Sequence, residues 1–279
     1  MITIADPSMI PTLKALWIEA FGDSMDYVDF FFNNRFNRID TYVYLVDNVP
    51  VSMAFVFNEE LRYKGEYLPA GYIYGVATAN DHRSKGYSTQ VLKRIHMDYP
   101  TTFLIPATKG LFDFYYKNGY KVAFSITEKR LHFHEMKSPN VSYSFESISP
   151  EEYKNIRDTF FKREGYVRWN LESITYSILE NEVWDGKALK VTLPKEKTNH
   201  IILYRYSENQ LYIKETTLSG QELSDVAFLL MKENKVEKCH IRLAPDHQQA
   251  SEPNSNFLEF GMLHSTYEVK NGYCNLVLD

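Results

Sequence analysis

The stretch of chain between residues 72 and 95 restricts the fold more than any other part of the sequence. Residues 72–78 form an apolar run rich in β-branched and aromatic side chains, which predicts a strand. After a short polar turn, apolar residues recur at helical spacing from about Tyr87. The turn contains Arg83-Ser-Lys-Gly-Tyr-Ser88, a basic loop of small residues. The sequence therefore predicts a strand–turn–helix corner whose turn is positively charged.

The basic loop has the features of a phosphate-binding turn. The first N–H groups of a helix have no partner within the helix, and the positive end of the helix dipole lies at the same place. An anion is therefore stabilised there. Gly86 allows the backbone to approach an anion closely, and Arg83 and Lys85 add positive charge. The alternative interpretation is an ordinary turn whose charges are solvated.

The same loop resembles the acyl-CoA signature of the GNAT superfamily of N-acyltransferases, [Q/R]-x-x-G-x-[G/A]. Here the signature is Arg83-x-x-Gly86-x-Ser88, in which the first two positions match and Ser88, still a small residue, replaces Gly or Ala. The preceding phrase Val76-Ala-Thr-x-x-x-x-Arg83 strengthens the resemblance. The loop has neither the GxxxxGK[ST] spacing of nucleotide triphosphatases nor the GxGxxG spacing of dinucleotide-binding folds.

Length and composition indicate a soluble protein of two domains. At 279 residues the chain is long enough for two domains of about 150 residues each. Its 44% hydrophobic and 24% charged residues are typical of a globular protein. The formal net charge of -5 argues against nucleic acid as a partner, because phosphate backbones need an electropositive surface. No apolar run approaches the roughly 18 to 20 residues that span a bilayer, so no membrane partner is expected.

The cysteine content indicates a cytoplasmic protein without a thiolate metal site. Cys239 and Cys274 are too few for a disulfide framework, and buried thiols are expected. The N-terminal residues have no basic region and no long apolar segment, so a secretory signal is not expected. His132 and His134 alternate beside Glu135, but nothing else completes a metal site, and no metal is expected.

The first half of the chain alternates strands and helices. Their order, β-α-α-β-β-β-α-β-α-β-β, is that of the GNAT fold, and the resemblance covers about residues 1–135. We expect strands at 2–5, 42–46, 51–57, 67–78, 101–105, 120–124 and 127–133. We expect a first helix after the start signal Asp6-Pro7-Ser8, with its apolar positions between Leu13 and Phe21, and further helices from Ser24, at 87–98 and at 109–117.

The order of elements begins again after a linker at residues 134–140. We expect strands at 141–148, 190–193, 201–206, 211–217 and 239–243, a terminal hairpin of 267–269 and 273–278, and helices at 153–161, 170–179 and 223–233. The chain is thus expected to be an α/β (α+β) protein whose GNAT fold, a mixed central sheet flanked by helices, is followed by a second, degenerate GNAT-like domain.

The two expected domains have different roles. Residues 1–136 would be the catalytic GNAT domain that binds acetyl-CoA, and residues 141–279 a scaffold that shapes the acceptor cleft. In the second domain the loop Thr217-Leu-Ser-Gly-Gln-Glu-Leu223 has no Arg and carries an acidic residue, so it is not expected to hold a pyrophosphate. The layout is similar to that of the aminoglycoside-acetylating "enhanced intracellular survival" enzymes, without their C-terminal lipid-carrier-like domain.

The resemblance implies where acetyl-CoA binds. In GNAT enzymes backbone N–H groups beside a splayed strand, here Gly75 to Thr78, hold the acyl carbonyl. The pantetheine arm follows the same strand and the pyrophosphate lies in the basic loop. The implied cofactor-binding residues are Val76, Ala77, Thr78, Arg83, Ser84, Lys85, Gly86, Tyr87 and Ser88. For Val76 the alternative is a strand-core residue whose backbone alone contacts the ligand.

The resemblance also implies a general acid. Many GNAT enzymes protonate the departing thiolate with a Tyr four residues before the Gly of a Tyr-x-x-x-Gly-[Phe/Tyr] phrase, and here Tyr115 occupies that position before Gly119-Tyr120. A phenol with an ordinary pKa of about 10 can donate a proton late in the reaction. Tyr116 is one helical step further and should face elsewhere. The alternative for Tyr115 is a packing residue.

The sequence does not single out a general base. Glu59 and Glu60 lie where a carboxylate could face the acceptor through water, and they are the candidates. Asp26 and Asp29 on the second helix are further options, and each carboxylate could equally be a surface charge. The C-terminal carboxylate of Asp279 is another, because the similar antibiotic-acetylating enzymes use their own C-terminus.

We therefore expect an acetyl-CoA-dependent N-acetyltransferase that transfers the acetyl group by direct attack of a primary amine of a small molecule or peptide. Neither cysteine falls in the motif region, which fits a route without a covalent enzyme intermediate. The acidic balance of the chain favours a cationic acceptor. The alternative is a non-catalytic acyl-CoA-binding protein with a regulatory or assembly role, and an acyl donor longer than acetyl is a third option.

Overall fold

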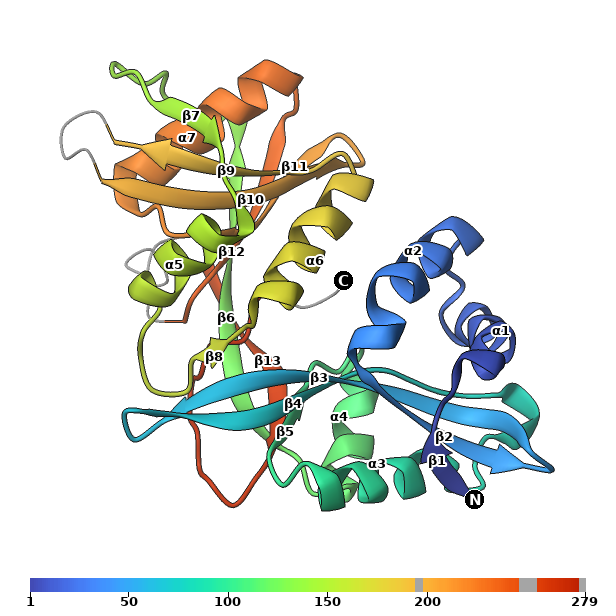
Figure 1. Ribbon diagram of the computed structural model, residues 1–279. Helices are drawn as coiled ribbons and strands as arrows, with labels where there is room; N and C mark the ends of the chain where they lie inside the picture. The colour runs from blue at the N-terminus through green and yellow to red at the C-terminus, as the bar shows by residue number, and fades with distance from the viewer. Residues whose placement is uncertain (194–197, 246–254, 276–279) are drawn as a thin grey trace. The chain divides into compact units, whose positions relative to one another are not determined.

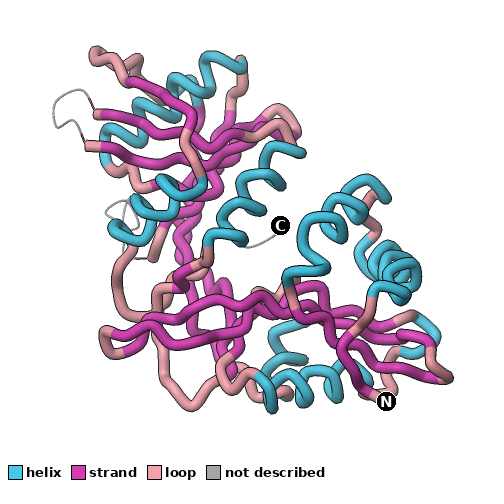
Figure 2. Tube along the Cα trace, viewed as in Figure 1, coloured by secondary structure: helices cyan, strands magenta, loops and turns pink. Residues whose placement is uncertain are grey.

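The computed structural model describes residues 1–193, 198–245 and 255–275 (Figures 1 and 2). The chain divides into two compact units. The first unit consists of Met1–Leu61, Tyr67–Val122 and Gly261–Glu268, and the second of Arg62–Glu66, Ala123–Phe260 and the segment that begins at Val269. Within the described ranges no helix is both long and apolar enough to cross a membrane.

The first unit is built on the sheet β1-β2-β3-β4-β5, to which the end of β13 is added. The strands β1, β2 and β3 pair antiparallel, whereas β4 and β5 are parallel and are joined through a helix, as parallel strands require. Its elements are β1 (Ile2–Ile4), η1 (Pro7–Met9), α1 (Ile10–Phe21), α2 (Met25–Arg35), η2 (Phe36–Arg38), β2 (Asp40–Val46), β3 (Val49–Tyr63), β4 (Glu66–Thr78), η3 (Asn80–His82), α3 (Tyr87–Asp98), β5 (Thr102–Leu104) and α4 (Lys109–Lys117).

Helices cover both faces of this sheet: α1 and α2 lie on one face, and α3 and α4 on the other (Figure 1). Aromatic side chains fill the α1–α2 face, where the Trp17 ring contacts Phe31 and Phe55. The α3–α4 face holds an apolar cluster that includes Ile73 of β4 and Leu104 of β5. Burial of these apolar surfaces is the main force that holds the helices to the sheet.

The second unit has the strand order β6-β12-β11-β10-β9-β7. The pair β11 and β12 is parallel, and the pairs β6·β12, β10·β11, β9·β10 and β7·β9 are antiparallel. Its elements are β6 (Lys121–His132), η4 (Phe133–Glu135), β7 (Ser144–Ser147), α5 (Pro150–Phe160), β8 (Val167–Arg168), α6 (Leu171–Val183), β9 (Lys187–Thr192), β10 (Asn199–Ser207), β11 (Gln210–Thr216), α7 (Gly220–Asn234), β12 (Lys238–Leu243) and β13 (Ser255–His264), whose last residues belong to the first unit.

The core of the second unit contains a buried ion pair. Arg157 of α5 and Glu215 of β11 are both fully buried, and Arg157 Nε lies 2.9 Å from Glu215 Oε2. The hydroxyls of Tyr153 and Tyr273 donate to the same carboxylate at 3.0 and 2.9 Å. A buried ion pair needs such additional hydrogen bonds to offset the loss of hydration. The free thiols of Cys239 and Cys274 are buried in this unit too, as expected.

The order of elements expected from the sequence is confirmed for most of the chain, and α3 and α4 have the expected bounds. Two strands expected at 120–124 and 127–133 are wrong, because β6 is one continuous strand whose residues Thr127–His132 pair along β12. The expected linker at 134–140 follows this strand. The units themselves divide at residues 122 and 123, because the pairing with β12 assigns β6 to the second unit.

The C-terminal part of the chain differs from expectation. Strand β13 was not expected, because its sequence Ser-Asn-Phe-Leu-Glu-Phe-Gly-Met-Leu-His does not alternate strictly between apolar and polar residues. The expected hairpin of 267–269 and 273–278 is not present as two strands in the described residues. Residues 267–269 are not in a strand, Tyr273 forms an isolated bridge with Tyr166, and residues 276–278 lie outside the described ranges.

Candidate active site

Strands β4 and β5 separate at the centre of the first unit. Their recorded parallel pairing joins Gly71 to Thr102 and Tyr72 to Phe103. Strand β5 ends at Leu104, whereas β4 continues to Thr78. Backbone N–H and C=O groups need hydrogen-bond partners, so the last residues of β4 offer an edge along which an extended ligand can bind. Separation of the strands at this place agrees with the splayed strand that the resemblance implied.

Gly75 bends β4 just before this edge. Its φ of +60° lies in the left-handed region, which glycine adopts with little strain. A Cβ atom at this position would also lie 2.7 Å from Cδ2 of the Phe55 ring, closer than van der Waals contact allows. Both the backbone and the packing therefore require glycine here.

The basic loop between β4 and α3 is open and exposed. Helix α3 begins at Tyr87 directly after Gly86, which has φ +79°, and no described side chain caps its first N–H groups. An added Cβ at Gly86 would meet nothing within 4 Å, so an anion can approach the backbone. Arg83 Nε donates to the Thr78 carbonyl oxygen at 3.2 Å, and Lys85 Nζ to the Asp81 carbonyl oxygen at 2.9 Å. These bonds keep both cations beside the helix N-terminus.

Two contacts that were not predicted from the sequence hold the ends of this loop. The Ser52 hydroxyl donates to the Ala77 carbonyl oxygen and also lies 2.8 Å from Thr78 Oγ1. At the far end of the loop the Tyr87 ring stacks on Tyr44, with ring centroids 4.3 Å apart. Since the Tyr87 side chain is held by β2, its backbone N–H is the part of the residue that can face an anion.

A contact from α1 supports the start of the same loop. Glu19 Oε1 accepts a hydrogen bond from the Asn80 backbone N–H at 2.7 Å. The two residues are far apart in the sequence, and nothing in either local pattern indicates the contact. Helix α1 thereby fixes η3, the turn that leads from β4 into the basic loop.

Tyr115 lies in the apolar cluster on the α3–α4 face, together with Ile73 and Leu104, and Val76 packs against the same cluster. It is 7% exposed, whereas Tyr116 is 47% exposed and points away as expected. Burial raises the pKa of Tyr115 above its usual value of 10, so the phenol stays protonated at neutral pH. No described residue hydrogen-bonds its hydroxyl, which is thus available to donate to a ligand.

Next to Tyr115 the core is polar but uncharged. The Tyr120 ring lies 5.6 Å from the Tyr115 ring, and the Tyr120 hydroxyl lies 2.9 Å from both His96 Nε2 and Thr102 Oγ1. The His264 ring stacks on His96 with centroids 3.6 Å apart. Burial, and then repulsion from His264, lowers the pKa of His96 to about 4, so the His96 imidazole is neutral at pH 7.

The candidate bases differ in their surroundings. Glu59 is buried in β3, and alternation along the strand places it on the same face as Phe55 and Phe57, toward α1 and α2. Glu60 is half-buried and faces the opposite side of the sheet. Asp29 is engaged with Lys14, whose Nζ donates to Asp29 Oδ1 at 2.7 Å. Glu59, like Asp29 of α2, lies on the face of the sheet away from Tyr115.

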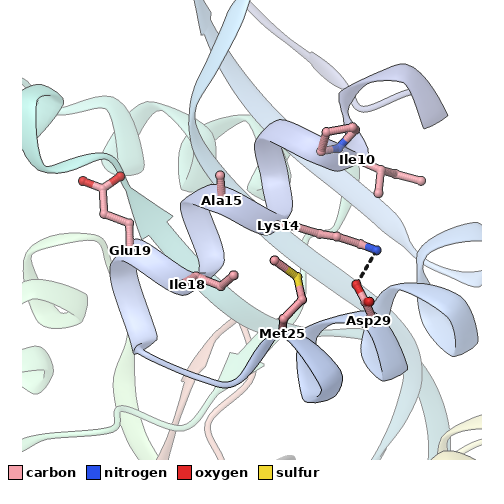
Figure 3. Close-up of a pocket in the computed structure, with 8 residues that line it drawn as sticks. Ile10, Lys14, Ala15, Ile18, Glu19, Met25 and Asp29 are labelled. Carbon is pink, nitrogen blue, oxygen red and sulfur yellow. Dashed lines mark hydrogen bonds and ion pairs between the residues drawn. The ribbon is translucent and has the colours of Figure 1, made fainter.

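A groove of about 680 Å³ lies between α1 and α2 (Figure 3). Figure 3 shows the Lys14–Asp29 ion pair beside Met25, and it shows Glu19 near the C-terminal end of α1. The groove is lined by apolar and charged residues: Ile10, Pro11, Lys14, Ala15, Ile18, Glu19, Met25 and Asp29. Its apolar surface ends at Glu19, which accepts the hydrogen bond from the Asn80 N–H in the turn after β4.

Comparisons with known proteins agree with this geometry. Residues 2–123 match the family model described as the acetyltransferase (GNAT) domain. This match confirms the resemblance drawn from the basic loop. A comparison with curated proteins gave no match. The family match falls on the part of the chain that contains the β4–β5 opening, the basic loop and Tyr115.

Solved structures match both units of the chain. A probable N-acyltransferase from Enterococcus faecalis V583 is 16% identical, with a TM-score of 0.74 over 94% of this chain and 72% of that one. A GCN5-related N-acetyltransferase from Anabaena variabilis is 16% identical, with a TM-score of 0.73 over the same shares. Eis1 from Mycobacterium abscessus is 13% identical, with a TM-score of 0.66 over 95% and 73%. At these identities the similarity establishes the fold.

Proposed function

We propose that this chain, which carries a GNAT acetyltransferase domain at residues 2–123, is an acetyl-CoA-dependent N-acetyltransferase that acts on a primary amine. The observation that carries the proposal is the exposed basic loop at the uncapped start of α3, beside the edge of β4 that β5 leaves open. Helix N-termini of this kind bind phosphate groups. A thioester held along β4 would place its pyrophosphate in the loop.

The proposed cofactor contacts follow from the exposure of each residue. In the loop, Arg83 and Lys85 supply charge, and the backbone of Ser84, Gly86, Tyr87 and Ser88 supplies N–H groups. Along β4, the backbone of Val76, Ala77 and Thr78 contacts the pantetheine arm, because the Val76 side chain packs into the core and the Thr78 hydroxyl lies beside Ser52. Backbone N–H groups after Gly75 polarise the thioester carbonyl.

Tyr115 is the proposed general acid. Its raised pKa keeps the phenol protonated, and its uncommitted hydroxyl can donate a proton to the departing thiolate of CoA. The attacking amine loses its proton to a base, for which we propose Glu59 before Glu60, because Glu59 lies on the face of the sheet opposite Tyr115. Acid and base would then act from the two sides of the thioester.

The acceptor is proposed to be a small molecule or peptide that carries a primary amine. The net charge of -5 favours a cationic acceptor. The apolar groove between α1 and α2 supports an acceptor with an apolar body. Residues 1–136 are proposed as the catalytic domain and residues 141–279 as a degenerate GNAT-like domain without a pyrophosphate loop.

Calorimetric titration with acetyl-CoA and with free CoA tests the proposal first. We expect the parent protein to bind both, and the Arg83→Ala/Lys85→Ala double variant to bind at least tenfold more weakly. The matched control is Lys93→Ala/Lys117→Ala, which removes two exposed lysines of the same unit outside the loop. Absence of binding to the parent, or equal weakening by the control, would show that the loop is an ordinary solvated turn.

Turnover is then measured by release of the CoA thiol over a panel of primary amines and peptides. An N-acetyltransferase releases thiol only with a suitable acceptor, and mass spectrometry shows a gain of one acetyl group on that acceptor. Tight acetyl-CoA binding without turnover over the whole panel would favour the non-catalytic acyl-CoA-binding alternative. Longer acyl donors tested in parallel distinguish acetyl transfer from transfer of a larger acyl group.

A further inference from the structure

The second unit has a small cationic pocket on the face of its sheet. Its volume is about 110 Å³, and it is lined by residues from β10, β11 and β12: Arg205, Tyr212, Ile213, Lys214, His240 and Arg242. We use the name cationic pocket for this set. A volume of a few water molecules fits a compact group such as a phosphate, and is too small for a nucleotide.

The pocket lies where two parallel strands part. The recorded pairing of β11 with β12 ends at Ile213 and Ile241, and the next residues along the two strands are Lys214 and Arg242. The register between β10 and β11 also shifts here, so that Lys214 has no Cα partner in β10. Such an irregularity redirects a side chain, and bulges of this kind are frequent at functional sites.

Among the described residues that line the pocket, four are basic and none is acidic. Lys214 is 6% exposed and its Nζ lies 3.7 Å from Glu180 Oε2, while His240 Nε2 lies 3.3 Å from Glu128 Oε2. The Arg242 guanidinium lies 5.5 Å from the Phe260 ring centroid. Two of the four basic residues in the cationic pocket thus have a carboxylate within 4 Å, Glu180 for Lys214 and Glu128 for His240.

Arg205 is the cation of the pocket for which the described residues provide no carboxylate partner. It is half-buried, and within the described ranges its guanidinium has no ion pair or side-chain hydrogen bond. The register places Arg205 opposite Tyr212, and Tyr212 opposite His240. Cations on neighbouring strands repel one another, and this repulsion lowers stability unless an anion lies between them.

We propose that the cationic pocket binds a phosphate group. The donors come from three adjacent strands, and a tetrahedral oxyanion directs its oxygens toward several strands at once. A planar carboxylate is satisfied by a single guanidinium fork. The proposal is independent of acetyl transfer, since every residue of the pocket belongs to the second unit and none to the basic loop.

The test is a titration of the ¹⁵N-labelled full chain with inorganic phosphate, followed by amide chemical shifts at constant ionic strength. We expect saturable shifts in β10, β11 and β12. Arg205→Gln should weaken phosphate binding at least fivefold, and Arg205→Lys, which keeps the charge but loses the fork, by a smaller factor. Arg205 is the variant of choice because its removal takes a partner from no carboxylate in the described part of the chain.

The matched control is Arg130→Gln, which removes an exposed cation from β6 opposite His240 but outside the pocket. It should change phosphate affinity less than twofold. Equal weakening by Arg130→Gln, or shifts that do not saturate, would overturn the proposal in favour of diffuse attraction. Malonate that binds as tightly as phosphate would overturn the choice of phosphate. Acetyl-CoA affinity should be the same in Arg205→Gln and the parent, which separates this site from the basic loop.

Discussion

The two units contain the same sequence of elements, strand–loop–helix–parallel strand, but their loops differ. In the first unit β4 leads through Arg83–Gly86, all exposed, into α3. In the second unit β11 leads into α7 through Thr217 and Leu218, both fully buried. Thr217 Oγ1 accepts a hydrogen bond from the Ile201 N–H, so this loop is attached to its own sheet.

The backbone of the two corners is similar, whereas the side chains differ. Gly86, with φ +79°, directly precedes α3, and Gly220, with φ +53°, is the first residue of α7. The third residue of α3 is Thr89, whereas the third residue of α7 is Glu222, whose carboxylate itself interacts favourably with the helix dipole. The proposal therefore assigns anion binding to the first corner because of its exposure and charge, and not because of its strand–loop–helix backbone alone.

Buried tyrosines give the largest expected difference between the units. Tyr115 has an uncommitted hydroxyl, so Tyr115→Phe should lower kcat about 10²- to 10⁴-fold, the range typical of a general acid, without changing acetyl-CoA affinity or stability. In contrast, Tyr153 donates to Glu215, so Tyr153→Phe should cost about 1.5–3 kcal/mol of unfolding free energy and leave kcat unchanged.

Steady-state kinetics and denaturant unfolding of both variants measure this difference. Tyr116→Phe is the control for Tyr115→Phe, because Tyr116 is exposed on the same helix. Equal kcat values for the Tyr115 and Tyr116 variants would show that Tyr115 is a packing residue.

Exchanging the third residues of α3 and α7 should weaken anion binding at the start of α3. Thr89→Glu gives α3 the acidic first turn of α7, and repulsion at about 5 Å costs roughly 3 kcal/mol at an effective dielectric constant of about 20. Acetyl-CoA affinity should therefore fall roughly a hundredfold, although the helix itself gains stability. The reciprocal Glu222→Thr should leave the affinity unchanged. Calorimetry measures the acetyl-CoA affinity of both variants. Equal affinities would contradict the proposed difference between the loops before α3 and α7.

A smaller effect is expected in the pH dependence of stability, and it arises from His96 in the first unit. The pKa of His96 is lowered to about 4 in the folded protein, so between pH 6.5 and 4 the unfolded chain binds a proton that the folded chain does not. Stability therefore falls as the pH is lowered through this range. His96 is partly exposed, and we expect about 1–2 kcal/mol of the effect to depend on it.

Denaturant unfolding at pH 7 and pH 4.5 measures this contribution. His96→Gln should lose less stability between the two pH values than the parent does. His134→Gln, at an exposed histidine, serves as the control and should behave like the parent. Parallel pH curves for the parent and His96→Gln would show that His96 is not responsible.

Features within one element could be read from the sequence, and features between elements could not. The bounds of α3 and α4 follow from apolar spacing, from Gly86 before α3 and from the Asn118-Gly119 stop after α4. The Glu19–Asn80 contact joins residues distant in sequence, so no local pattern indicates it.

The cationic pocket was not predicted from the sequence either, although part of its residue pattern is visible there. His240 and Arg242 alternate with apolar residues along β12, which indicates one polar face. That Arg205 and Lys214 share this face depends on the register of three strands and on the irregularity at Lys214. The register is set by packing between strands, so it cannot be predicted from the residue pattern of one strand.

The burial of both cysteines decides how the chemistry of this protein can be followed. Burial raises the pKa of the Cys239 and Cys274 thiols above the usual value, so neither forms a thiolate readily and neither is accessible to solvent. An aromatic disulfide reagent added to the folded protein should therefore react with free CoA and not with the enzyme. A colorimetric assay would start from a flat baseline, and a slow rise in signal without substrate would report unfolding.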